Sequence, residues 1–129
     1  MGMRGKGQIA ELAEIAQPNT GIITGVGSAH IELLGSREEI AKAKWELADF
    51  LKESGETLVI PAYDEHLISL SKDFPQDKIL WINLEKDAIS TLILEKQWIE
   101  NDRQYFQFSD KTTGKSHSAV LSVLGKHQI

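Results

Sequence analysis

The apolar positions in the first two-thirds of the chain alternate between helical spacing and short continuous runs. A first set with helical i, i+3, i+4, i+7 spacing predicts a helix from about Gly7 to Gln17, which Pro18 ends. This set consists of Ile9, Leu12, Ala13 and Ala16.

A second helix is predicted from residue 36 to residue 55. Ser36 and Glu39 form a capping box at its start, and Gly55 provides a stop signal at its end. Its apolar stripe consists of Ile40, Ala43, Leu47 and Leu51.

Short apolar runs separate the helices and predict three strands, over residues 21–26, 57–61 and 78–82. Asp64 is a predicted cap for a short helix that carries Leu67 and Leu70. Because helices and strands alternate, right-handed crossovers onto a parallel sheet are expected.

From residue 88 the pattern changes to three strand-like runs, over 89–99, 104–108 and 118–124, joined by polar turns. The predicted fold is therefore α/β: a three-layer, Rossmann-like, mostly parallel sheet with helices, followed by a small antiparallel sheet. We expect one domain over 1–129, with a parallel α/β part at 1–87 and antiparallel strands at 88–129. No strand precedes the first helix, so we expect the sheet to be truncated at its N-terminal side.

Composition excludes several classes of protein. The chain has 129 residues, 41% of them hydrophobic and 26% charged, which is normal for a globular domain. The net charge of −5 argues against a nucleic-acid partner. The chain has no cysteine, so a disulfide framework and thiolate metal sites are excluded. No apolar run is long enough for a membrane span.

His30 is the first candidate for chemistry. It follows the predicted strand 21–26, and open α/β sheets collect ligands beyond the carboxyl ends of their strands. Gly25 and Gly27 would let a phosphate or a metal approach the backbone. The residues alone leave two interpretations open, an ordinary loop histidine and a ligand.

Lys44 is the second candidate, because it lies on the apolar side of its helix whereas Lys42 falls on the solvated side. Burial lowers the pKa of a lysine and makes its neutral amine reactive. The alternative is a lysine whose stem packs while its ammonium group reaches water.

The other motifs give weaker evidence for a functional site. The segment Thr113–Ser116 imitates the end of a phosphate-binding loop, but Ser109 stands where the first glycine is required, so we interpret it as a hairpin turn. We expect His66, His117 and His127 to be surface or structural residues, and the three tryptophans (Trp45, Trp81 and Trp98) to pack in the core or on the sheet.

Taken together, the motifs resemble the Mur ligase family. The segment 23–32, Ile-Thr-Gly-Val-Gly-Ser-Ala-His-Ile-Glu, is similar to the family's I-T-N-I-G-x-x-H-x-E motif, and 34–44 matches the helix that follows it. His30 and Lys44 are 14 positions apart, which is the family's usual offset. The opening segment 1–9 resembles the one after the family's second-strand glutamate, and the ending 124–129 resembles its G-x-H-N segment.

The resemblance implies that the chain is the later part of a central ATP-binding domain. It implies that His30 binds Mg²⁺ and that Lys44 is carbamylated and helps to hold the metal. Gly25, Gly27 and Ser28 would lie in the loop near the nucleotide and the metal. A carbamate turns a cation into an anionic oxygen ligand, which Mg²⁺ prefers.

The implied activity is that of an ATP-dependent ligase of peptidoglycan precursor synthesis in the bacterial cytoplasm. The likeness is strongest to members that join D-alanyl-D-alanine to the UDP-N-acetylmuramoyl tripeptide through an acyl phosphate. Gly25 departs from the family's asparagine, and the chain holds no phosphate-binding loop. We therefore expect the 129-residue chain alone to be catalytically inactive, which detectable ATP hydrolysis would contradict.

Two alternatives remain open at this stage. One is another Mur-like amide ligase, acting on a different muramyl peptide, a folate or a poly-amino-acid substrate. The other is a stand-alone binding domain that has kept the fold without the chemistry. The stand-alone domain would be a stable monomer with an unmodified, metal-free Lys44. Against it, a sheet that lacks its opening strands leaves apolar edges that favour self-association, and for the same reason we expect an excised piece of a ligase to self-associate.

Overall fold

The computed structural model describes residues 2–27, 31–83 and 89–122, apart from the side chain of Leu33. The described chain separates into two compact units, residues 1–81 and 82–129. The α-helices are α1 (Gln8–Ala16), α2 (Ile31–Leu34), α3 (Arg37–Ser54) and α4 (Glu65–Leu70). The strands are β1 (Thr20–Ile22), β2 (Thr57–Pro61), β3 (Ile79–Asn83), β4 (Leu92–Glu100), β5 (Arg103–Asp110) and β6 (Lys115–Leu121).

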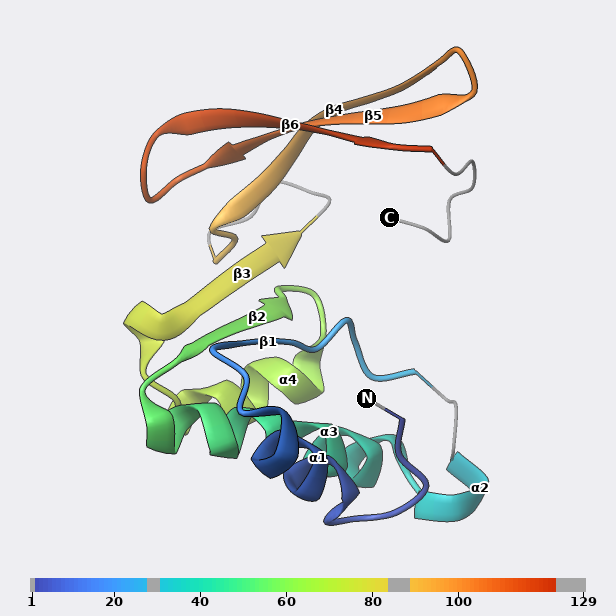
Figure 1. Cartoon of the computed structure of the whole chain (residues 1–129), viewed down its shortest axis with the longest axis vertical. Helices are drawn as coiled ribbons and strands as arrows, with labels where there is room; N and C mark the ends of the chain where they lie inside the picture. The colour runs from blue at the N-terminus through green and yellow to red at the C-terminus, as the bar shows by residue number, and fades with distance from the viewer. Residues whose placement is uncertain (1, 28–30, 84–88, 123–129) are drawn as a thin grey trace. The chain divides into compact units, whose positions relative to one another are not determined.

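The first unit is built on α3, the longest helix. Ser36 accepts a hydrogen bond from the Glu39 amide at its start, and Gly55 ends it in the left-handed conformation. Both signals were predicted, and both are confirmed. Figure 1 shows α1, α3 and α4 gathered on one side of β1 and β2. The helix α3 carries seven buried side chains, among them Leu47 and Leu51, which face Gly21 of β1.

The strands of the first unit follow the order β1-β2-β3, and β1 pairs with β2 in parallel. β1 is shorter than the predicted run of residues 21–26. The Ile23 amide still donates to the Val59 carbonyl at 3.0 Å, but Gly25 then takes a φ of +146°, which strands do not adopt. The chain therefore leaves the sheet as a loop at this point.

The core of the first unit is apolar and continuous. It extends from Met3 to Trp81 and includes the fully buried side chains of Ile40, Leu51, Leu58, Ile60 and Leu67. The prediction that Trp45 and Trp81 pack in the core is confirmed, because each is 8% exposed. Two 3₁₀ turns, Ser71–Asp73 and Gln76–Lys78, connect α4 to β3.

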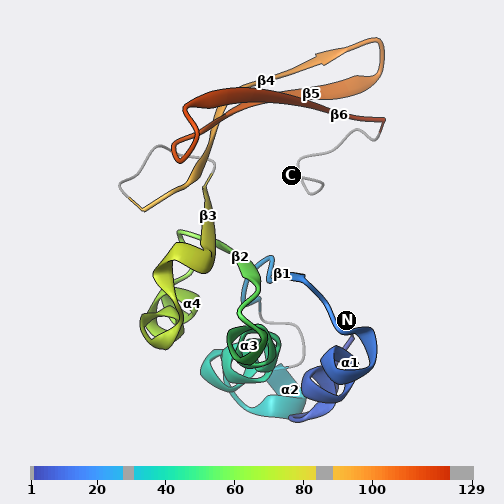
Figure 2. The same cartoon turned by 60° about the vertical axis from the view of Figure 1, so that its left-hand side comes forward.

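The second unit is an antiparallel meander, which Figures 1 and 2 show as a long twisted ribbon. Ile82 and Asn83 pair in parallel with Leu92 and Ile93, and the pairs β4·β5 and β5·β6 are antiparallel. Trp98 stacks on Tyr105 across the β4·β5 pair. The predicted α/β class, with a following antiparallel sheet, is confirmed.

Some predictions on the second unit reach beyond the described residues. The predicted strand 118–124 is β6 in its described part and reaches beyond it, and His127 lies outside the described residues. Residues 111–114 form the turn between β5 and β6, with Gly114 at a φ of +68°, and Lys115 and Ser116 begin β6. The hairpin interpretation of Thr113–Ser116 is therefore confirmed. None of the described helices is long and apolar enough to cross a membrane.

Candidate functional site

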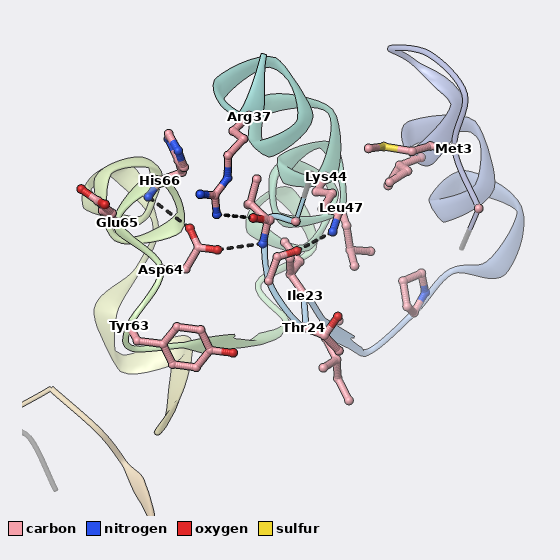
Figure 3. A pocket seen from close by; sticks show the side chains of 18 of the residues that line it. Met3, Ile23, Thr24, Arg37, Lys44, Leu47, Tyr63, Asp64, Glu65 and His66 are labelled. Atoms are coloured by element: carbon pink, nitrogen blue, oxygen red, sulfur yellow. Dashed lines mark hydrogen bonds between the residues drawn. The ribbon is translucent and has the colours of Figure 1, made fainter. Parts of the chain in front are cut away.

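A pocket of about 930 Å³ opens in the first unit beyond the carboxyl end of β1. Its walls come from the N-terminal residues, the segment 18–27, the first three turns of α3 and the connection from β2 to α4. Figure 3 shows the polar side chains that converge on it, Arg37, Lys44 and Asp64 among them. The carboxyl ends of the parallel strands β1 and β2 thus meet at one pocket, as expected for an open α/β sheet.

The backbone of the 25–27 loop is held by three charged side chains. The Lys44 ammonium group donates to the Gly25 carbonyl. The Asp64 carboxylate accepts from the Val26 amide at 2.7 Å, and Arg37 donates to the Val26 carbonyl at 2.6 Å. These contacts come from α3 and from the N-cap of α4, so two helices determine the path of one loop (Figure 3).

Lys44 lies on the buried side of α3, where the helical spacing predicts it. Its side chain is half-buried, whereas Lys42 is exposed and pairs with Glu38 and Glu39 on the solvent side. Burial lowers the pKa of Lys44, and the nearby Asp64 carboxylate opposes that shift. The amine is therefore deprotonated more readily than that of an exposed lysine, and a neutral amine is a nucleophile.

Asp64 is 7% exposed and has two roles in the backbone network. One carboxylate oxygen accepts from the His66 and Leu67 amides, at 3.2 and 3.3 Å, and so caps α4. The other oxygen accepts from Val26. The sequence predicts the cap, which is confirmed, but it does not predict the contact with the loop.

Gly25 is the point at which only glycine suits the backbone. Its φ of +146° lies in a region that other L-residues rarely adopt. A Cβ built at this position would lie 3.8 Å from Asp64 Oδ2, so space is available and the restriction is conformational. The glycine that replaces the family's asparagine here is thus tied to the shape of this loop.

The structure brings three of the five candidate residues together, since Gly25, Gly27 and Lys44 all line the pocket. Ser28 and His30 lie outside the described residues. The pocket lining also includes Arg37, Tyr63, Asp64 and His66, which were not among the candidates. The signal for Tyr63 and Asp64 was available, because both directly follow a predicted parallel strand.

The donor set allows a test of whether Mg²⁺ fits here. Over residues 2–27, 31–83 and 89–122, no three histidine or carboxylate side chains gather into a metal-binding group. The Asp64 oxygens already accept from three amides, and the Lys44 ammonium group would repel a cation. A divalent metal fits this pocket only after the charge of Lys44 has been removed or reversed.

Comparisons with known protein families and sequences point to the same family. A family model described as the Mur ligase middle domain matches residues 1–129. Two curated relatives are named UDP-N-acetylmuramoyl-tripeptide-D-alanyl-D-alanine ligase. The one from Synechocystis sp. is 45% identical over 85 residues, which is 66% of this chain and 18% of the relative. The one from Bacillus subtilis is 33% identical over 129 residues, 100% of this chain and 26% of the relative.

Solved structures agree with the fold. The MurF ligase from Thermotoga maritima, in complex with ADP, is similar with a TM-score of 0.73 and 26% identity, over 93% of this chain and 26% of that one. The apo form of L. casei FPGS has a TM-score of 0.62 at 19% identity, over 86% of this chain and 25% of that one, and shows the fold alone. The chain thus spans about a fifth to a quarter of the two curated relatives' length.

Proposed function

This chain belongs to the Mur ligase family through its middle domain, and from that premise we propose that it serves in an ATP-dependent peptide ligase. The proposed reaction joins D-alanyl-D-alanine to the UDP-N-acetylmuramoyl tripeptide during peptidoglycan precursor synthesis in the bacterial cytoplasm. The names of the Synechocystis and Bacillus relatives support the substrates. The ADP complex of the Thermotoga relative supports the nucleotide.

The observation that carries the proposal is the position of Lys44. It is half-buried in the pocket wall at the carboxyl end of β1, and its amine contacts the loop that carries the family motif. In an open α/β sheet this edge is where ligands bind. A half-buried amine at this edge is well placed to act on a ligand that binds there.

In the proposed reaction the terminal carboxylate of the tripeptide takes the γ-phosphoryl group of ATP and becomes an acyl phosphate, with ADP as the leaving group. The amine of D-alanyl-D-alanine then attacks the carbonyl carbon, the C–O bond to phosphate breaks, and the amide forms with release of inorganic phosphate and a proton. ATP and Mg²⁺, when bound, supply the phosphoryl group and neutralise its negative charge. What this chain itself contributes is a loop at residues 25–27 whose backbone conformation is fixed. Asp64 and Arg37 hold the backbone at Val26, and Gly25 permits the positive φ.

Lys44 would complete a metal site as a carbamate, together with His30. The neutral amine nitrogen forms a bond to the carbon of CO₂ and releases one proton, which leaves an anionic carboxylate at the end of the side chain. The lowered pKa of Lys44 favours this step because it raises the fraction of neutral amine. The product replaces a repelling cation with two oxygen ligands of the kind that Mg²⁺ prefers.

A chimeric enzyme would test the function. Residues 1–129 would replace the matching quarter of the Bacillus subtilis relative, and amide formation from the tripeptide and D-alanyl-D-alanine would be measured. If the chimera is active, the substitution Lys44→Ala is expected to remove most of its activity. Short carboxylic acids added to the assay should restore part of that activity. Lys42→Ala is the matched control on the exposed side of α3, and it should change little. Equal activities of the two variants would contradict the role of Lys44.

Two other functions remain candidates. One is a Mur-like amide ligase with another acceptor, on the same fold as FPGS, and the chimera tested with folate or poly-amino-acid substrates would reveal it. A non-catalytic binding domain predicts an unmodified Lys44. Incubating the 129-residue chain with [¹³C]bicarbonate and recording a ¹³C spectrum would distinguish it, because a carbamate gives a separate carbonyl resonance.

A further inference from the structure

Two opposite charges hold one peptide group in the pocket wall. The peptide that joins Gly25 to Val26 has its carbonyl bonded to the Lys44 ammonium group and its amide bonded to the Asp64 carboxylate. Lys44 and Asp64 are thus connected through one backbone peptide group, with one side chain bonded to each end of it (Figure 3). The following carbonyl, that of Val26, accepts from Arg37, so the next peptide group is also held.

This peptide needs to be held because glycine precedes it. A peptide group can rotate as a unit when the flanking backbone angles change together, and Gly25 has no Cβ to oppose the rotation. Such a flip would point the Val26 amide at the Lys44 ammonium group and the Gly25 carbonyl at the Asp64 carboxylate. Both contacts would become repulsive, donor against donor and acceptor against acceptor.

We propose that Asp64 is a positioning residue of this site, which locks the Gly25–Val26 peptide in the orientation that gives Lys44 its acceptor. The lock depends on the charge and on both oxygens of the carboxylate. One oxygen is occupied by the cap of α4, and the other is committed to Val26. Asp64 therefore joins the start of α4 to the loop that leads toward residues 28–30.

The importance of this lock for catalysis rests on the proposed function, but the lock itself does not. It involves only described residues of the first unit, and it requires neither nucleotide nor carbamate. It can therefore be measured on the 129-residue chain. A chain with an intact lock and no carbamate signal would contradict the proposed role of Lys44 and leave the inference about Asp64 standing.

The substitution Asp64→Asn separates the two roles of the carboxylate. Asparagine is as good an N-cap as aspartate, so its one amide oxygen can still accept from Leu67. Its NH₂ group would then face the Val26 amide, where no acceptor remains. The Gly25–Val26 peptide should lose its preferred orientation while α4 stays capped.

Amide hydrogen exchange, followed by NMR, measures both roles at once. In Asp64→Asn we expect the Val26 amide to exchange at least about tenfold faster, because it loses a hydrogen bond to a charged acceptor. The Leu67 amide should stay within about a factor of two, and the thermal midpoint should change little. Asp64→Ala, which removes both oxygens, should accelerate exchange at Val26 and Leu67 together.

Two results would overturn the inference. One is unchanged Val26 exchange in Asp64→Asn, which would mean that the carboxylate does not hold the loop. The other is a parallel loss of protection at Val26 and Leu67 in Asp64→Asn, with a lower thermal midpoint, because the loop and the cap of α4 would then not be separable. Ser36→Asn is the control for the substitution of a cap, since the Ser36 side chain accepts from the Glu39 amide at the start of α3.

Discussion

At the scale of single residues, close approach between β1 and α3 depends on Gly21. The side chains of Leu47 and Leu51 occupy the space in which a Cβ at Gly21 would lie. Both leucines are in the core, and Leu51 is fully buried. The helix can therefore lie against the strand only because this position has no side chain.

Gly21→Ala should destabilise the first unit by about 1–3 kcal/mol, the usual effect of overpacking a core. The added methyl would overlap Leu51 Cδ1 and lie 3.0 Å from Leu47, so both leucines would have to shift. Urea unfolding followed by circular dichroism measures the change. The control is Gly5→Ala, because a Cβ there meets nothing within 4 Å. Equal midpoints for the two variants would show that the β1–α3 contact is looser than described.

At the scale of elements, the helices begin in different ways. Ser36 and Asp64 cap α3 and α4 with their own side chains, as the sequence predicts. The start of α1 has no such cap, because Gly7 stands at the N-cap position. Glu46 of α3 takes over this role by accepting from the Gly7 and Ala10 amides at 2.6 and 3.2 Å. A side chain from another helix thus stabilises the first turn of α1.

Glu46→Gln should lower the free energy of unfolding by about 1 kcal/mol, since the amide offers one acceptor where the carboxylate offers two and carries no charge at the helix N-terminus. The Gly7 and Ala10 amides should also exchange faster with solvent. Glu53→Gln, on an exposed position of the same helix, is the matched control. If Glu53→Gln lost as much stability as Glu46→Gln, the negative charge on α3 would account for the effect, and the capping of α1 would not.

Local signals explain which elements could be predicted. Helix α3 has a cap, an apolar stripe and a glycine stop within about twenty residues, and all three are present in the structure. Helix α2 was not predicted, because four residues carry too little periodicity. The contacts of Glu46 with Gly7 and of Asp64 with Val26 join residues nearly forty positions apart, so no local pattern indicates them.

The candidate site was predictable to the extent that strand ends and helix faces determine it. Gly25, Gly27 and Lys44 were found by these rules, and the structure places all three at one pocket. What the rules cannot supply is the direction of each hydrogen bond. The Gly25 carbonyl accepts from Lys44 because of the local backbone conformation, which the residue types do not specify.

At the scale of the whole molecule, the first unit presents apolar side chains on its strands. Ile22 of β1 is 63% exposed and Leu80 of β3 is 36% exposed. In the described strand order β1 comes first, so one of its edges has no partner strand among the described residues. Exposed apolar strands with a free edge favour association.

We therefore expect the 129-residue chain to self-associate at micromolar concentrations, which sedimentation velocity would measure. Ile22→Thr keeps a β-branched side chain while making it polar, and it should shift the distribution toward monomer. Ile15→Thr is the control, because Ile15 is 81% exposed on α1, away from the strands. A monomer at all concentrations, or an equal shift in both variants, would contradict this expectation.

The three tryptophans give the two units separate optical signatures. Trp45 and Trp81 are almost completely shielded in the first unit, whereas the partly exposed Trp98 of the second unit stacks on Tyr105 with ring centroids 5.2 Å apart. An aqueous quencher of fluorescence would therefore reach Trp98 preferentially. The ordered, stacked pair would also contribute to the near-ultraviolet dichroism of the second unit. The unfolding of each unit can be followed in the unlabelled chain, without a probe or a substitution.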